Sequence, residues 1–170
     1  YTAATATGTT PTITYSHESG SSFSVGVTTV TATATNGCGT ASCSFTVTVN
    51  DTQNPTITAP ANVTVNANSG ACNATGYDLG SATTADNCGV ASVTNNDAGT
   101  YSVGTHNITW TVTDVNGNTA TATQTITVVD NQNPTITAPA NVTVNANSGA
   151  CNATGYDLGS ATTADNCGVA

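Results

Sequence analysis

The sequence predicts an all-β protein built from tandem β-sandwich repeats, and three observations lead to this prediction. Residues 51–91 recur as residues 130–170 with one difference, Thr52 against Asn131, which sets a period of 79 residues. Long amphipathic helices are not expected, because Leu occurs at only two positions, Met is absent and the β-branched residue Thr is abundant. Apolar and polar residues alternate in the second half of the repeat, as in half-buried strands. A small repeated domain made of strands accounts for all three.

The strand candidates of the repeat follow one another at short intervals. Four short candidates come first, separated by Pro, Asn-Ser-Gly and Asp-Asn turn signals: residues 56–58, 62–65, 75–80 and 89–94. Two longer candidates follow, "THNITWTVTD" and "TATATQTITVV", and the turn "DVNGN" between them predicts a hairpin. Six or seven strands in a unit of this size predict a sandwich of two sheets.

Alternation along the two long candidates predicts which residues face the core. In the first, Ile108, Trp110 and Val112 share one face, and we expect His106 and Asn107 to face solvent. In the second, the expected inward set is Ala120, Ala122, Ile126 and Val128. The predicted core of the repeat is Ile57, Val63, Val65, Tyr77, Leu79, Ile108, Trp110, Val112, Ile126 and Val128.

The repeat divides the chain into three parts. Residues 1–50 match the back half of a repeat, because "FSVGVTTVTATAT" aligns with "YSVGTHNITWTVT". Ala32 then stands where Trp110 does and Phe45 where Gln124 does, so this half is packed differently. Residues 51–129 form a complete repeat, and residues 130–170 are the front half of another.

Half a sandwich exposes apolar faces and unpaired strand edges, so each half is expected to be completed. Either the array continues past both ends, or the front half of one chain joins the back half of the next in a composite domain. Independent stability of each half is the third alternative. The chain begins without Met or a leader signal, and we expect it to be a processed product or an excised window of a longer protein.

The charge excludes several classes of partner. Lys and Arg are absent and the formal net charge is −9, so nothing neutralises the phosphates of nucleic acid or of an anionic membrane surface. No apolar run reaches the length of a membrane span. Cations are the partners that this charge favours.

Six cysteines indicate an oxidising compartment: Cys38, Cys43, Cys72, Cys88, Cys151 and Cys167. Cys72 and Cys88 recur as Cys151 and Cys167, so we expect one internal disulfide in each repeat. Buried free thiols and a zinc site are the alternatives, although a zinc site would normally have closely spaced CxxC pairs.

Catalysis is not expected. His17 and His106 are the two histidines, and neither recurs at the matching place of the other repeat. No nucleophile-elbow or HExxH pattern accompanies them. A solvated surface histidine explains the same residues.

The polar residues of the repeat suggest two further properties, calcium binding and glycosylation. The segments between repeats resemble the Asp/Asn-rich calcium linkers of cadherin-like arrays and offer oxygen ligands for calcium, with Asp86, Asp97 and Asp114 as nearby additions. The linker oxygens are those of Asp51, Asn54, Asp130, Asn131 and Asn133. Ordinary turn chemistry is the alternative interpretation. Asn-x-Ser/Thr glycan acceptors occur at Asn50, Asn62, Asn73, Asn107, Asn141 and Asn152.

Several phrases together carry a family resemblance: "DTQNPTIT", "SGAC", "ADNCG", "YSVGTHNITWTVTD", "NGNTA" and "TITVVD". The chain resembles the hyalin repeat (HYR), an immunoglobulin-like module of extracellular adhesion proteins and bacterial surface arrays. The resemblance implies tandem immunoglobulin-like sandwiches of seven strands, used as a spacer or an adhesive bead, with no catalytic residues.

The cysteines depart from this family in one respect. Many relatives carry a Cys after the "TIT" strand and another in the penultimate strand, where this chain has Ala59 and Ala122. Cys43 falls at the position of Ala122. Its family-type partner would precede Tyr1, and a local bridge to Cys38 is the alternative.

The leading expectation is a structural or adhesive protein, extracellular or on a cell surface, that forms a fibre or stalk by joining to itself. The alternative is a carbohydrate- or ice-binding surface, suggested by Thr-x-Thr rows and by Tyr77 and Tyr101 as exposed aromatic candidates. Glycans are thus expected either as ligands or as modifications.

Overall fold

The computed structural model describes residues 3–8 and 10–169, and every regular element in them is a β-strand. The chain divides into two compact units. The first comprises residues up to 56 with 84–92 and 112–120, and the second comprises 57–83, 93–111 and 121–170. Among the described residues, no helix has the length and apolarity needed to cross a membrane. The predicted all-β class is confirmed.

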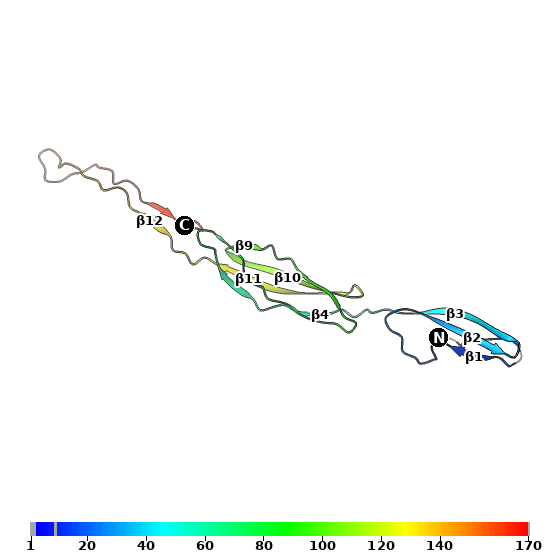
Figure 1. Ribbon diagram of the computed structural model, residues 1–170. Coiled ribbons are helices and arrows are strands. Elements are labelled where there is room, and N and C mark those ends of the chain that lie inside the picture. The colour runs from blue at the N-terminus through cyan, green and yellow to red at the C-terminus, as the bar shows by residue number, and fades with distance from the viewer. Residues whose placement is uncertain (1–2, 9, 170) are drawn as a thin grey trace. The chain divides into compact units, whose positions relative to one another are not determined.

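The N-terminal sheet has three antiparallel strands in the order β1-β2-β3 (Figure 1). They are β1 (Thr12–Tyr15), β2 (Gly26–Asn36) and β3 (Gly39–Val49). β2 and β3 form a hairpin whose register runs from Gly26↔Val49 to Asn36↔Gly39. Val30 and Ala32 are buried on one face of this sheet.

Residues 51–129 contain eight strands, and two of them are long (Figure 1). β10 and β11 are the predicted hairpin and lie inside a four-stranded sheet of order β5-β11-β10-β8. The remaining strands form the pairs β4-β7 and β6-β9. The bounds are β4 (Thr56–Thr58), β5 (Val63–Asn66), β6 (Asn73–Thr75), β7 (Thr83–Ala85), β8 (Val90–Asn95), β9 (Thr100–Ser102), β10 (Gly104–Asp114) and β11 (Thr119–Val129).

The sheets enclose the predicted core. Ile108, Trp110, Val112, Ile126 and Val128 are buried, because period-two alternation turns them all to one side. The front-half members pack against this centre and stay partly exposed: Ile57, Val63, Val65, Tyr77 and Leu79. The predicted core is therefore confirmed, with its centre on the two long strands.

The predicted orientation of His106 is wrong. His106 lies two residues before Ile108, so strand geometry directs both side chains to the same face. Its ring stacks on Tyr101 with 4.8 Å between centroids, and Nε2 lies 2.8 Å from the Ser102 carbonyl oxygen. Asn107 does face solvent, as predicted.

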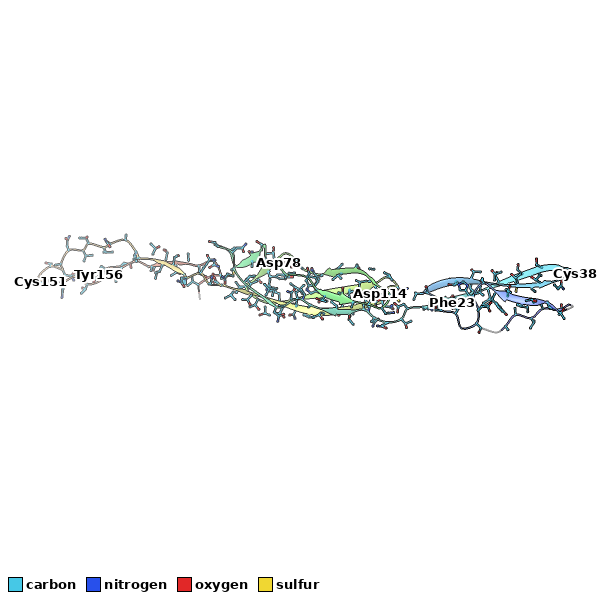
Figure 2. The ribbon with its side chains drawn as sticks, turned by 60° about the horizontal axis from the view of Figure 1, so that its bottom comes forward. Phe23, Cys38, Asp78, Asp114, Cys151 and Tyr156 are labelled. Carbon is cyan, nitrogen blue, oxygen red and sulfur yellow. A yellow bond between two sulfur atoms is a disulfide. The ribbon has the colours of Figure 1, made fainter. Side chains whose placement is uncertain are left out.

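Part of the local structure of residues 51–91 recurs in residues 130–169, but this described segment has no strands equivalent to β5 and β6. β12 (Thr135–Thr137) pairs antiparallel with β13 (Thr162–Ala164), as β4 pairs with β7 one period earlier. Cys151 and Tyr156 stand on the long loop between these two strands (Figure 2). Six large apolar residues of this segment are exposed, and the part of the chain that the structure describes contains no second β10–β11 hairpin over them: Ile136, Val142, Val144, Tyr156, Leu158 and Val169.

Candidate functional site at the repeat junction

Three carboxylates converge where the complete repeat begins. Asp51 follows β3, Asp86 follows β7 and Asp114 ends β10 (labelled in Figure 2). One oxygen from each lies within 4.8 Å of the others. The chain has no Lys or Arg, so no such cation can neutralise this acidic cluster.

Asp114 is the best-supported member of the acidic cluster. Its side chain is 2% exposed. Oδ1 accepts hydrogen bonds from the backbone N–H groups of Asn116 and Asn118, both 2.8 Å, and Oδ2 accepts one from Asn118 Nδ2 at 2.7 Å. Burial raises the pKa of Asp114, but the bonds from Asn118 and Asn116 outweigh it and leave the pKa lowered. These bonds keep the carboxylate ionised.

The other two members leave oxygens without regular partners. Asp51 Oδ1 accepts from Gln53 N, and Asp86 Oδ2 accepts from the backbone N–H groups of Cys88 and Gly89. Asp51 Oδ2 and Asp86 Oδ1 are buried, and neither oxygen accepts a hydrogen bond of normal geometry. Such oxygens are suited to a hard cation.

The Cys88 thiol lies beside the acidic cluster. Its interaction with the Asp51 carboxylate raises the pKa of Cys88, and burial and the Asp86 and Asp114 charges act in the same direction. Cys88 therefore stays protonated over a wider pH range than an ordinary thiol.

The structure brings together only some of the oxygens expected for calcium, namely those of one linker residue and two of the three nearby additions. Asp51 lies with Asp86 and Asp114, whereas Asn54, Asn131 and Asn133 are exposed linker residues. Asp130 Oδ1 accepts from Gln132 N and from Asn166 Nδ2. The clue in the sequence was Asp114 itself, which ends a strand immediately before a tight turn. Asp97 lies outside the cluster and accepts a hydrogen bond from Tyr77 Oη.

The predicted internal disulfides are wrong. Cys72 pairs with Cys167, 95 residues away, so the bridge links one repeat to the next. Cys38, Cys43, Cys88 and Cys151 are free thiols, and the alternative Cys38–Cys43 bridge is not formed. Cys38 lies in the turn between β2 and β3 (Figure 2).

Hydrogen bonds surround the Cys72–Cys167 bridge. Asn166 Nδ2 donates to the Ala71 carbonyl at 2.9 Å and to Asp130 Oδ1 at 3.2 Å. Gln132 Oε1 accepts from Gly70 N at 3.0 Å, and its Nε2 donates to the Asn68 carbonyl at 3.1 Å. Hydrogen bonds of Gln132 and Asn166, together with the disulfide, therefore hold the segments 130–132 and 166–167 against the loop 68–72.

The glycan acceptors differ in exposure. Asn107 is exposed on the outer face of β10, whereas Asn73 is partly buried in β6. Asn62 is exposed, but its Oδ1 already accepts a hydrogen bond from Thr125 N at 2.9 Å. The other three acceptors, Asn50, Asn141 and Asn152, are exposed.

Tyr77 and Tyr101 are not the exposed aromatic residues that the sequence suggested for ligand binding. Both are partly buried and pack against the core around Ile108 and Trp110. Their rings lie 5.9 Å apart, and Tyr77 Oη donates to Asp97 Oδ1 at 2.8 Å. Burial and this bond to Asp97 raise the pKa of Tyr77 well above its ordinary value.

No curated protein matches the chain. A comparison with protein families, however, agrees with the repeat architecture. The family model described as the HYR domain matches two consecutive segments, residues 1–49 and 50–128. These segments cover most of the chain, and the second contains the complete sandwich and the acidic cluster. The chain therefore belongs to the HYR domain family.

Proposed function

We propose that this protein is a structural or adhesive extracellular protein whose HYR domains stack head to tail into a stalk or filament. HYR domains are non-catalytic repeat modules of extracellular proteins. The Cys72–Cys167 disulfide suits an oxidising extracellular setting. Head-to-tail stacking requires residues 1–50 and 130–170 to act as incomplete domains that find their complements.

The exposure of residues 130–170 carries this proposal. Ile136 is 73% exposed and Leu158 is 65% exposed. Their counterparts one period earlier, Ile57 and Leu79, pack against the core of the complete repeat. Exposed apolar area costs roughly 25 cal/mol per Å², so a face of this kind favours a covering partner.

The N-terminal sheet offers a matching face. A hollow of about 530 Å³ opens on it, and its lining includes Ile13, Ala32, Ala34 and Cys43. Ala32 occupies the position of Trp110, so the side chain that fills the complete repeat is missing here. We propose that this hollow and the exposed face of residues 130–170 are the two halves of one sandwich.

Strand pairing inside the complete repeat supports this joining of the halves. There β5 pairs in parallel with β11 in the register Ile126↔Val63 and Val128↔Val65. The equivalent residues of the incomplete domains are Val142 and Val144 on one side and Val47 and Val49 on the other. A continuing chain or a neighbouring copy can supply the same pairing.

The mass of the native assembly tests this proposal. We expect light scattering of the 170-residue chain to show concentration-dependent oligomers, and Leu158→Asp to abolish them. Val93→Asp, which changes an exposed apolar residue of the complete repeat, is the matched control and should leave them intact. A monomer at all concentrations would contradict assembly between copies and leave the continuous array as the alternative.

A second candidate function is binding of carbohydrate or ice by the outer threonine rows. Thr119, Thr121 and Thr123 are exposed along β11 and support this alternative, while the burial of Tyr77 and Tyr101 does not. A glycan-array screen and an ice-recrystallisation assay test it, and no response in either would favour the scaffold.

We also propose that the acidic cluster binds calcium. Three carboxylates within 4.8 Å, two of them with buried oxygens lacking a regular partner, fit the hard oxygen ligands that calcium prefers. The two positive charges of the ion would offset two of the three carboxylate charges of Asp51, Asp86 and Asp114, and its coordination would stiffen the start of the repeat. We further propose that the exposed acceptors are glycosylated, and the solvent-facing orientation of Asn107 supports this.

A further inference from the structure

Each cysteine of the Cys72–Cys167 disulfide has an equivalent cysteine one period away that forms no disulfide. Cys72 lies one period before Cys151, and Cys167 lies one period after Cys88. Both Cys88 and Cys151 are free thiols. Each free cysteine is therefore one half of a pair that already forms once within the chain.

The surroundings of these cysteines are duplicated too. We call residues 68–72 the loop half of the bridge, and Asp130, Gln132, Asn166 and Cys167 the linker half. The period places a second loop half at residues 147–151. It places a second linker half at Asp51, Gln53, Asn87 and Cys88. Every side chain that makes a polar contact across the bridge recurs unchanged.

The unused loop half already has the conformation of the used one. Asn68 N donates to the Asn73 carbonyl at 2.7 Å, and Asn147 N donates to the Asn152 carbonyl at 2.8 Å. A second turn bond, from Ala71 N to the Asn68 carbonyl at 2.9 Å, recurs from Ala150 N to the Asn147 carbonyl at 3.0 Å. Cys151 is exposed at the end of this loop (Figure 2).

The unused linker half is preorganised in the same way. Gln53 N donates to Asp51 Oδ1 at 3.0 Å, as Gln132 N does to Asp130 Oδ1 at 3.1 Å. Cys88 N donates to Asp86 Oδ2 at 2.8 Å, as Cys167 N does to Asp165 Oδ2 at 3.1 Å. Two preorganised halves lose little conformational freedom when they dock.

We propose that Cys151 of one copy forms a disulfide with Cys88 of a second copy of this chain. The proposal rests on head-to-tail stacking, in which residues 130–170 of one copy complete residues 1–49 of the next. Cys151 then belongs to the repeat immediately before the next copy's residues 51–129, which carry Cys88. This is the order in which Cys72 precedes Cys167, so every junction between repeats acquires the same bridge.

The chemistry is ordinary thiol oxidation. The Sγ–Sγ bond forms as both thiols lose their protons and together two electrons. A small-molecule disulfide such as oxidised glutathione accepts them, and its own S–S bond breaks to give two thiols. The heterologous contact joins head to tail without closing, so repetition yields a covalent filament.

The experiment uses the full chain with Cys38→Ser and Cys43→Ser, which removes the two thiols outside this scheme. After incubation with oxidised glutathione, we expect a ladder of multimers on a non-reducing denaturing gel that collapses to one band on reduction. Cys88→Ser alone and Cys151→Ser alone should each lose the ladder. An equal mixture of the two single variants should give covalent dimers and nothing larger, because one linkage of the required kind remains.

Light scattering of the single variants, combined with the gel of their mixture, separates this inference from the proposed stacking. Light scattering without oxidant reports non-covalent oligomers in each single variant. Oligomers in that measurement but no covalent dimer in the mixture would overturn the disulfide and leave the stacking in place. Absence of oligomers and of covalent dimers would overturn both. Dimers formed by Cys88→Ser alone or Cys151→Ser alone would reveal like-with-like pairing and would also overturn the proposal.

Discussion

Trp110 and Gln124 form a hydrogen-bonded pair inside the complete repeat. The indole Nε1 donates to Gln124 Oε1 at 3.0 Å, and both side chains are buried. Gln124 Nε2 donates in turn to the carbonyls of Ala61 at 2.7 Å and Leu79 at 2.9 Å. One glutamine therefore links the back half of the repeat to two loops of the front half, and all its polar atoms are satisfied.

Replacing this glutamine should weaken the repeat. Gln124→Leu leaves the indole N–H and two carbonyls without partners, and we expect a loss of about 3 kcal/mol in the free energy of unfolding. Trp110 is the one tryptophan of the chain, so its fluorescence in a urea titration reports on this core directly. Thr123→Leu, on the exposed side of the same strand, is the control and should change the stability by less than about 0.5 kcal/mol. Equal midpoints for Gln124→Leu and the unmodified chain would show that the hydrogen bonds of Gln124 do not stabilise the repeat.

The sequence predicted the long strands well because their signal is local. Alternation identified Ile108, Trp110, Ile126 and Val128 as inward residues, and the structure buries all four. Gln124 lies on the same period, two residues before Ile126, but a polar side chain gives no local sign of burial. Its partners come from residues 61, 79 and 110, and only the tertiary structure brings them together.

The disulfide could not be predicted from spacing, because the repeat makes two pairings look alike. Cys88 and Cys167 stand in the same sequence context, so Cys72 has two candidate partners with identical neighbours. The structure selects Cys167 through contacts of Asn166 and Gln132 with the loop 68–72. The acidic cluster was missed in part for a similar reason, since Asp86 and Asp114 meet Asp51 only after the strands have paired.

Removal of the inter-repeat bridge should destabilise the complete repeat. The Cys72–Cys167 loop encloses most of residues 51–129, and on the chain-entropy model Cys167→Ser lowers the free energy of unfolding by about 2–4 kcal/mol. Cys88→Ser, at the equivalent free position, should leave it nearly unchanged. Urea titration under non-reducing conditions makes the comparison. A loss in Cys88→Ser and none in Cys167→Ser would instead support a bridge between Cys72 and Cys88.

Calcium should stabilise the repeat through the acidic cluster. We expect millimolar calcium to raise the melting temperature by several degrees relative to EDTA, because the ion relieves repulsion among Asp51, Asp86 and Asp114. Asp86→Asn should remove most of this shift while keeping an acceptor for Cys88 N. Asp78→Asn, on an exposed turn that caps Gly80 N, should leave the shift intact. Identical melting curves in calcium and EDTA would rule out the site.

Alkaline pH should weaken the packing around Tyr77. The pKa of Tyr77 is raised by burial and by Asp97, so the folded state favours the neutral phenol. This stabilisation is fully present below the ordinary tyrosine pKa of about 10 and is lost as the pH rises toward the higher pKa of the folded state. Tyr77→Phe should make the stability less dependent on pH above 10, at a cost of about 1 kcal/mol at neutral pH.

Tyr156→Phe is the control for this titration, because Tyr156 is the exposed counterpart of Tyr77 one period later. Its pH dependence should match that of the unmodified chain. Circular dichroism in urea at several pH values measures both variants. A Tyr77→Phe profile as steep as the original would show that another group controls the alkaline transition.

Glycosylation should follow exposure rather than the mere presence of an acceptor motif. Asn107 is exposed on the outer face of β10, where an attached sugar points into solvent, whereas Asn73 is partly buried in β6 beside the buried Ala74. We therefore expect mass spectrometry of the natively expressed protein to find sugar on Asn107 and none on Asn73. Asn107→Gln should remove that mass without changing the unfolding midpoint by more than about 0.5 kcal/mol. An intact mass equal to that of the bare polypeptide would show that the acceptor motifs arise from the abundance of Asn and Thr alone.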